Sequence, residues 1–355
     1  MRIQQYERYL VGCRFCTMCT PFGEVRNLKQ DEPHSTRIRA LILWRILKGY
    51  AEWNEDVGKL LYESTLDSVS QSWCISDYPV PEYILAARAD IFDAGLAPES
   101  VNMYTLRADQ SFRERLSPYA KDSSEIVFYP GDALAAKDVH NAQIILELLK
   151  DHDQEVALPS KIFPSGGIAH CLGRHDLVGG LVEEVIEDLR RYSKILVDGP
   201  LTFWMLSIVY PNYGIHLPEG VEIQGLHSYL LDLLPDDVYS VPSMTEKTFL
   251  VGSEFSRLQD LGYEPFWKLL QKVQGLDLIE PDGGLDYADS SGVGGALHIS
   301  FPELAQRVSL ARIDEACQVG ADFILCDSPL DAAHLRQVSN GRIKIKTVPE
   351  LFFEE

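Results

Sequence analysis

The sequence predicts an α/β protein in which an all-α N-terminal domain precedes two repeated α/β units with parallel sheets. The first part carries apolar residues at helical spacing and few strand-like runs. From about residue 124, short apolar runs alternate with amphipathic segments, which is typical of parallel sheets covered by helices. The same order of elements then recurs. We therefore expect domains at residues 1–118, 119–245 and 246–355.

The N-terminal domain is predicted to be built from helices. Ser35 can cap a helix over residues 36–50, because its hydroxyl can accept a hydrogen bond from a free backbone N–H of the first turn. A second helix is expected over 55–62. A third, over 82–94, is expected to end at Gly95, since glycine adopts the left-handed backbone that closes a helix.

The two α/β units are predicted from matching orders of elements. In the first unit we expect strands at 126–129, 155–158 and 195–197 and helices at 139–150 and 181–192. In the second we expect strands at 248–251, 277–279 and 323–325 and helices at 264–273 and 303–318. Glycine-rich loops at 163–167 and 292–295 occupy equivalent places, so one α/β unit used twice is the economical interpretation.

Composition and charge narrow the class of protein. The chain has 355 residues, 46% of them apolar, and a net charge of −21, which disfavours nucleic acid and anionic lipid as partners. No apolar run reaches about 18 residues, and the first residues lack the apolar core of a signal peptide. Seven cysteines, several of them clustered, argue against a disulfide framework. We expect a cytoplasmic protein.

Three cysteines at a repeated two-residue spacing, Cys13, Cys16 and Cys19, form the main motif, and Cys74 stands far downstream. Such a run holds one side of a four-iron cluster, whose fourth thiolate comes from a distant segment. Zinc and ordinary buried cysteines are the alternatives. Structural zinc sites usually pair two separated two-cysteine knuckles, so the spacing favours iron and sulfide.

A second run repeats the spacing of a bacterial ferredoxin motif but has kept only its last cysteine, Cys74. Its other three positions hold Ser64, Asp67 and Ser70. In two-cluster ferredoxins, the fourth cysteine of each run binds the other run's cluster. The surviving thiols are therefore a complete set for one cluster. We predict a ferredoxin-like domain with one [4Fe-4S] cluster on four ligands (Cys13, Cys16, Cys19 and Cys74) and an empty second site.

These motifs resemble the iron–sulfur subunits of glycolate oxidase, anaerobic glycerol-3-phosphate dehydrogenase and heterodisulfide reductase. That family joins a helical two-cluster ferredoxin domain to two cysteine-rich "CCG" repeats. The resemblance covers nearly the whole chain and is best in the stretch from Trp73 to Pro81, followed by Ile84 to Asp90.

The chain resembles a degenerate member of that family, because the CCG cysteines are missing. In the second unit their places are taken by Ser253, by the loop 290–295 (Ser-Ser-Gly-Val-Gly-Gly) and by the turn 328–331 (Ser-Pro-Leu-Asp). The first unit has Gly131-Asp132, residues 164–167 and residues 199–202 in the equivalent places. The glycines and prolines that shape the backbone remain, so the family's disulfide or substrate chemistry is not expected here.

The resemblance implies an electron-transfer subunit with no catalytic residue of its own. Its partner in a larger oxidoreductase complex would be a flavoprotein, a cluster-bearing paralogous subunit, or both. The alternative is a structural subunit in which the single cluster is a staple. An acidic surface would lower the cluster potential, and Arg14, inside the motif, would oppose this.

Other residues have ordinary explanations that we favour. Cys326 and Cys317 are expected in the core, and Cys171 beside His170 is a weak metal pair. The aromatic group of Trp204, Tyr210 and Tyr213 is expected in the core or an interface. Four carboxylates could gather to hold a hard cation, although solvated surface carboxylates explain them as well: Glu254, Asp289, Asp327 and Asp331.

Overall fold

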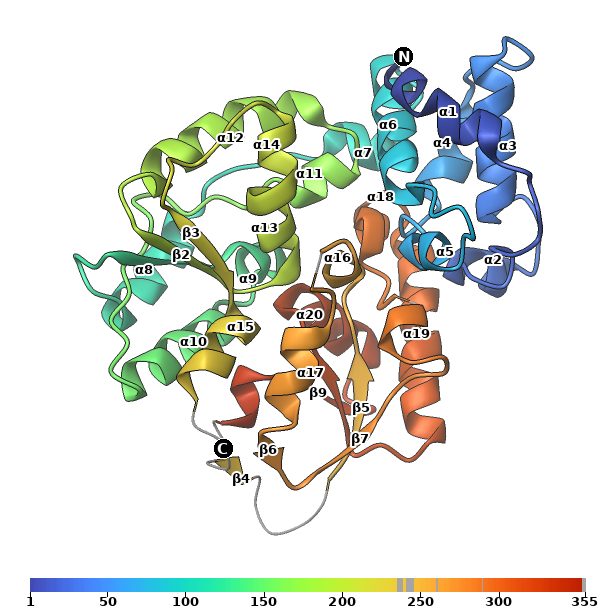
Figure 1. The fold of residues 1–355 in the computed structure, drawn as a ribbon. Coiled ribbons are helices and arrows are strands. Elements are labelled where there is room, and N and C mark those ends of the chain that lie inside the picture. The colour runs from blue at the N-terminus through green and yellow to red at the C-terminus, as the bar shows by residue number, and fades with distance from the viewer. Residues whose placement is uncertain (235–238, 241–245, 260, 289, 353–355) are drawn as a thin grey trace.

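The computed structural model has the mixed α/β architecture that the sequence predicts (Figure 1). It describes residues 1–234, 239–240, 246–259, 261–288 and 290–352. Within these ranges, we find no helix with the length and apolar character needed to cross a membrane.

The N-terminal part is a group of helices packed around α6 (Val80–Asp93). Prolines at its N-cap and in its first turn suit a helix start, where backbone N–H groups have no partner within the helix. Between Val80 and Ile91 every residue except Glu82 is buried. The other helices are η1 (Arg2–Tyr6), α1 (Glu7–Gly12), α2 (Glu24–Lys29), α3 (Thr36–Leu47), α4 (Glu55–Tyr62), α5 (Ser68–Ser72), α7 (Glu99–Met103), α8 (Gln110–Leu116) and η2 (Ser117–Tyr119).

The first α/β unit contains a parallel sheet in the order β1-β2-β3. Its strands are β1 (Ile126–Tyr129), β2 (Lys194–Val197) and β3 (Glu222–Gly225). Its helices are α9 (Gly131–Ala136), α10 (Val139–Asp151), α11 (Gly167–Cys171), α12 (His175–Leu189), α13 (Pro200–Trp204), the π-helix η3 (Met205–Val209), α14 (Tyr210–Asn212) and α15 (Leu226–Leu233).

The second unit contains a parallel sheet in the order β7-β5-β8-β9. Its strands are β5 (Glu246–Val251), β7 (Leu276–Ile279), β8 (Phe323–Cys326) and β9 (Lys344–Thr347), and the short β4 (Tyr239–Ser240) pairs with β6 (Val273–Gln274). Its helices are α16 (Glu254–Arg257), α17 (Glu264–Leu270), η4 (Leu285–Tyr287), η5 (Gly294–Ala296), α18 (Leu297–Ser300), α19 (Pro302–Gln318), α20 (Pro329–Ser339) and η6 (Pro349–Leu351).

Two expected elements of the first unit differ in the structure. The strand expected at 155–158 is reduced to two isolated bridges, from Ala157 to Lys121 and to Val127. Pro159 follows it and has no N–H to continue a ladder. Helix α12 begins at His175, six residues before the expected start, and its two glycines lie within the helix with open space around them. Counting the Ala157 bridge, the first sheet has the same strand order as the second.

Alternating strand residues connect each sheet to helices on both faces. Val127 and Tyr129 share a core with α12, whereas Phe128, between them, shares a core with α10 and α15. That second core also contains Leu250 and Leu325 of the other sheet. The two units are therefore joined by one continuous apolar core, and their strands end toward a common interface.

Candidate functional site

The cysteine loop lies between α1 and α2, and Cys74 follows α5. Helix α1 ends at Cys13, whose backbone N–H donates to the Tyr9 carbonyl. The thiol of Cys16 belongs to an exposed residue, while Cys13, Cys19 and Cys74 are partly buried. None of the four forms a disulfide, so all four thiols are available as ligands.

The thiols of the loop influence one another electrostatically. Burial raises the pKa of Cys13, and the nearby Cys74 and Cys16 raise it further. Burial also raises the pKa of Cys19 to about 12, with contributions from Cys13 and Cys16. The Phe15 N–H donates to Cys13 Sγ at 3.4 Å. Thiols with raised pKa values favour a bound cation, because the cation stabilises the thiolate form of each cysteine.

Among the described residues, no three His, Cys, Asp or Glu side chains converge closely enough to hold a single metal ion. The choice between zinc and an iron–sulfur cluster therefore stays as the sequence leaves it.

The charge around the loop differs from that of the whole chain. Residues 1–50 contain nine Lys or Arg and four Asp or Glu, although the chain carries a net charge of −21. Arg14 is exposed. The surroundings of the cysteine loop in the sequence are therefore basic.

The second ligand set is brought together by the fold. The Ser64 hydroxyl donates to Asp67 Oδ1, and the Thr36 hydroxyl lies 3.1 Å from Asp67 Oδ2 and 2.9 Å from Ser70 Oγ. Arg39 Nη1 lies 2.5 Å from Asp67 Oδ2, and both side chains are 1% exposed. The three residues expected around the second site therefore lie close together, and a buried ion pair with its hydrogen bonds lies among them.

The remaining donors of Arg39 are also satisfied. Its Nε donates to the Leu60 carbonyl and its Nη2 to the Glu63 carbonyl. A buried guanidinium is stable only when its charge and its N–H groups have partners. Each guanidinium nitrogen of Arg39 therefore has a partner, and the network forms a buried polar core in the helical part.

A second buried arginine, Arg88 of α6, joins the three parts of the chain. Its guanidinium donates to the carbonyls of Leu61 and Ser64, to Cys171 in the first unit and to Gly295 in the second. Burial lowers its pKa to about 10, and the Tyr62 ring lies 5.2 Å away. Gly295 has φ of +56°, and a Cβ there would lie 2.9 Å from the Ser64 carbonyl oxygen. This close approach allows its carbonyl to meet Arg88.

Two buried glutamates also link the helical part to the second unit. Glu24 accepts hydrogen bonds from the Thr65 hydroxyl and the Ser290 N–H. Glu254 accepts from the Ser68 N–H and pairs with Arg257. Burial raises the pKa of Glu254 to about 7, against the opposing charge of Arg257. The serines in place of the cysteines therefore take part in a polar interface.

In the first unit, two aspartates lie in separate turns. Each accepts hydrogen bonds from the first turn of the helix that starts beside the other aspartate. Asp198, directly after β2, accepts from the N–H groups of Asp132 and Ala133 at the start of α9. Asp132 accepts from the N–H groups of Leu201 and Thr202 and from the Thr202 hydroxyl in α13. Burial raises the pKa of Asp132 to about 6, and burial together with the charge of Asp132 raises the pKa of Asp198 well above its usual value.

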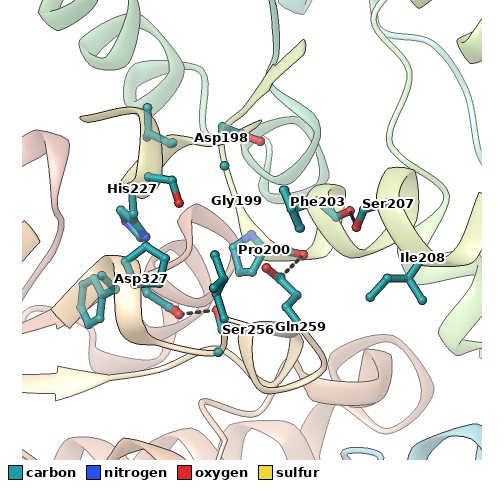
Figure 2. A pocket seen from close by; sticks show the side chains of 17 residues that line it. Asp198, Gly199, Pro200, Phe203, Ser207, Ile208, His227, Ser256, Gln259 and Asp327 are labelled. Atoms are coloured by element: carbon teal, nitrogen blue, oxygen red, sulfur yellow. Dashed lines mark hydrogen bonds between the residues drawn. The ribbon is translucent and has the colours of Figure 1, made fainter. Parts of the chain in front are cut away.

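The second unit repeats this arrangement with changes. Asp327, directly after β8, accepts from the Ser253 N–H at 2.7 Å and from the Ser256 hydroxyl at 2.6 Å (Figure 2). Asp331 accepts from the Ser291 hydroxyl. Burial raises the pKa of Asp327 to about 8, and the nearby Asp331 adds to the shift. Asp327, Asp331 and their serine partners are therefore a buried, hydrogen-bonded set.

The hard-cation hypothesis is not supported by the described residues. Glu254, Asp327 and Asp331 are at most 3% exposed, so they are not the solvated carboxylates that the sequence favoured. No three carboxylates converge on a point within the described residues. Asp289, the fourth candidate, lies outside those residues.

The remaining cysteines divide into two groups. Cys326 is buried, as expected. Cys171 is buried as well, and burial raises its pKa to about 12. Cys317 is exposed, so the expectation of a core position is wrong. Helix α19 buries Ile313 and Ala316, and the next residue along is rotated by about 100° from that face.

The aromatic group lies mainly in the core. Trp204 and Tyr210 are buried, and Tyr213 is partly buried beside His170. Burial lowers the pKa of His170 to about 4, so its ring is neutral.

Sequence reasoning missed Arg39 and Arg88 as site residues. Each stands among apolar residues on a strongly apolar helix, which was the available signal of a buried cation. It also missed the pairing of Asp132 with Asp198, because hydrogen bonds between separate turns leave no pattern in the sequence.

Comparisons with known proteins support a loose relationship. No family model matches the chain. A subunit of the fumarate reductase (CoM/CoB) of Methanothermobacter marburgensis is 23% identical over 232 residues, which cover 64% of this chain and 46% of that protein. The chain thus spans about half the length of this curated relative. A crystal structure of a hypothetical protein from Helicobacter pylori superposes with a TM-score of 0.52 at 10% identity, covering 89% of this chain and 66% of that one. This second likeness shows the fold alone.

Proposed function

We propose that this chain is an electron-transfer iron–sulfur subunit of a larger oxidoreductase complex. The observation that carries the proposal is the asymmetry between the two ligand sets. Four free cysteines remain on the loop and after α5, while the other set is occupied by the Arg39–Asp67 pair. The name of the curated relative, a reductase subunit, supports the same class of function.

The proposed cofactor is one [4Fe-4S] cluster held by Cys13, Cys16, Cys19 and Cys74. Such a cluster accepts and releases single electrons, and the chain sets its potential through charge, hydrogen bonds and exposure. The Phe15 N–H would stabilise negative charge on the Cys13 sulfur. The exposed Cys16 side of the loop is the side from which an electron partner could approach.

The proposed setting is a cytoplasmic hetero-oligomer with a flavoprotein, a cluster-bearing paralogous subunit, or both. No catalytic residue is assigned to this chain. We also propose that the domain boundaries lie near residues 118 and 245, with the continuous core between the two α/β units making them act together.

A second candidate function is that of a structural subunit in which the cluster is a staple. The polar interface favours it, because Arg88, Glu24 and Glu254 lock the helical part to both units without any cofactor. In that case the cluster would stabilise the conformation of the cysteine loop and would not transfer electrons.

The test is iron and sulfide analysis of anaerobically purified protein, followed by low-temperature EPR after reduction. We expect about four iron and four sulfide per chain and a reversible one-electron signal. Cys16→Ala should lose the signal, and Cys171→Ala, a buried cysteine away from the loop, should keep it. Iron-free protein would refute both candidate functions. A cluster that cannot be reduced reversibly would refute electron transfer and favour the structural subunit.

A further inference from the structure

A cavity of about 440 Å³ lies between the two α/β units, away from the cysteine loop (Figure 2). Asp198 follows β2, Gly225 ends β3 and Asp327 follows β8, and all three line the cavity. The carboxyl ends of parallel strands from both sheets thus open into it. Open α/β sheets bind ligands at such strand ends, and the volume falls within the roughly 300–1,000 Å³ of small-molecule sites.

The walls of the cavity are mostly apolar and contain several aromatic and proline side chains. Phe203 and Pro200 come from α13, and Pro265 and Phe266 come from α17. The His227 ring lies 5.2 Å from the Phe266 ring at 41°. Figure 2 shows Pro200 and Phe203 of α13 and His227 of α15 around the space. Such surfaces favour a planar ring system, because stacked and edge contacts bury area with defined geometry.

The polar groups of the cavity carry little charge at neutral pH. No Lys or Arg lines it among the residues that the structure describes. Burial lowers the pKa of His227 to about 4, which leaves its ring neutral. Burial raises the pKa of Asp327 to about 8, so this carboxyl holds its proton. An anionic ligand such as a phosphate would find no counter-charge there, and its desolvation would be uncompensated.

One end of the cavity offers hydrogen bonds. Asp327 and the Ser256 hydroxyl are 2.6 Å apart, and both line the space. When the Asp327 carboxyl is protonated, both side chains carry an O–H donor. The hydrogen bond between Ser256 and Asp327 uses only one of these donors. The pair can therefore donate to an oxygen of a ligand.

We propose that the cavity binds an uncharged aromatic molecule that carries a carbonyl or similar oxygen, with its rings between Phe203, His227 and Phe266 and its oxygen at Ser256 and Asp327. This site is separate from the cysteine loop. Its occupation does not depend on a cluster, so failure of either proposal leaves the other standing.

Two naphthalene dyes of similar size test the proposal on the full chain. The neutral ketone Prodan should bind with a rise and blue shift of its fluorescence, and the sulfonate ANS should bind roughly tenfold more weakly or worse, because its charge is unpaired in the cavity. Equal binding of both dyes would overturn the assignment of a neutral ligand.

Two variants test whether Prodan binds in the cavity. Ser228 lines the cavity from α15, so Ser228→Trp should fill the space and weaken Prodan binding by roughly tenfold or more. Thr105→Trp, at an exposed position outside the cavity, should bind Prodan as the wild type does. Prodan binding that is equal in the two variants would refute the site.

A measurement on the unmodified chain guards against a variant that fails to fold. Benzophenone, a neutral aromatic ketone, inserts into adjacent C–H bonds on irradiation. Its label should map to peptides containing residues 199–208, 225–228 or 256–266. Label found only on other peptides would overturn the proposal.

Discussion

Arg39 and Asp67 form an ion pair at 2.5 Å in which both side chains are almost completely shielded from water. The pair lies among Ser64, Ser70 and Thr36, where the sequence predicts that a second cluster has been lost. Its charge is balanced locally, and its donors reach two backbone carbonyls. The former ligand site has become a structural element of the helical part.

Breaking this pair should strongly destabilise the protein. Asp67→Ala leaves the Arg39 charge buried and unpaired, and the free energy of unfolding should fall by about 3–5 kcal/mol. Urea denaturation followed by circular dichroism measures the change. Glu7→Ala, which breaks the exposed pair of Glu7 with Lys48, is the control and should cost less than about 1 kcal/mol. Equal effects of the two substitutions would contradict the importance of the buried pair.

Arg88 should not be replaceable by lysine. Arg88→Lys keeps the charge, but a single ammonium cannot reach four carbonyls from three parts of the chain. With about 1 kcal/mol for each lost hydrogen bond, we expect a loss of roughly 2–3 kcal/mol. The control is Arg107→Lys, at an exposed loop position, which should leave the urea midpoint unchanged. If both variants match the wild type, the proposed role of Arg88 is wrong.

The buried carboxyls predict that stability falls as pH rises. Burial raises the pKa of Asp327 to about 8 and of Glu254 to about 7, above their values in the unfolded chain. The folded state therefore binds more protons, and this contribution is complete below about pH 4 and lost as pH rises through 7 and 8. The melting temperature should be lower at pH 9 than at pH 6.

One variant isolates this effect. Asp327→Asn can still accept from the Ser253 N–H, and it has no proton to lose. Its melting temperature should vary less between pH 6 and pH 9 than that of the wild type. Asp322→Asn, at an exposed residue that accepts from the Lys247 N–H, should keep the wild-type slope.

Arg14 should raise the potential of the proposed cluster. Reduction adds negative charge beside an exposed guanidinium, so Arg14→Gln should lower the midpoint potential, and the difference should shrink at high salt. Redox titration monitored by EPR measures it. Arg45→Gln, an exposed arginine near the end of α3, provides the comparison. Identical midpoint potentials in the Arg14→Gln and Arg45→Gln variants would refute the proposed effect of Arg14.

The sequence predicts the arrangement of the fold better than its details. Helical spacing identifies α3 and α4 because most of their apolar residues recur on the buried face, even though that face of α3 also carries Arg39. It gives no sign of β3, where Glu222 and Gln224 alternate with Ile223 and a glycine in a half-exposed edge strand. The edge position explains this failure, since an edge strand needs few apolar residues.

The candidate site divides in the same way. Spacing alone identifies Cys13, Cys16 and Cys19, because ligands within one loop are close in the sequence. The partners of Asp67 and of Asp327 could not be predicted, since Arg39 and Ser253 reach them through the tertiary fold. The sequence predicts which positions matter, whereas only the structure shows which groups surround them.

The Arg39–Asp67 pair also restricts how this chain can change. A single step to cysteine at position 67 would strand a buried cation, at a cost of about 3–5 kcal/mol out of a typical total of about 5–15. Removing the arginine first would strand the carboxylate instead. Because either single change leaves a buried charge without its partner, we expect positions 39 and 67 to change together in evolution.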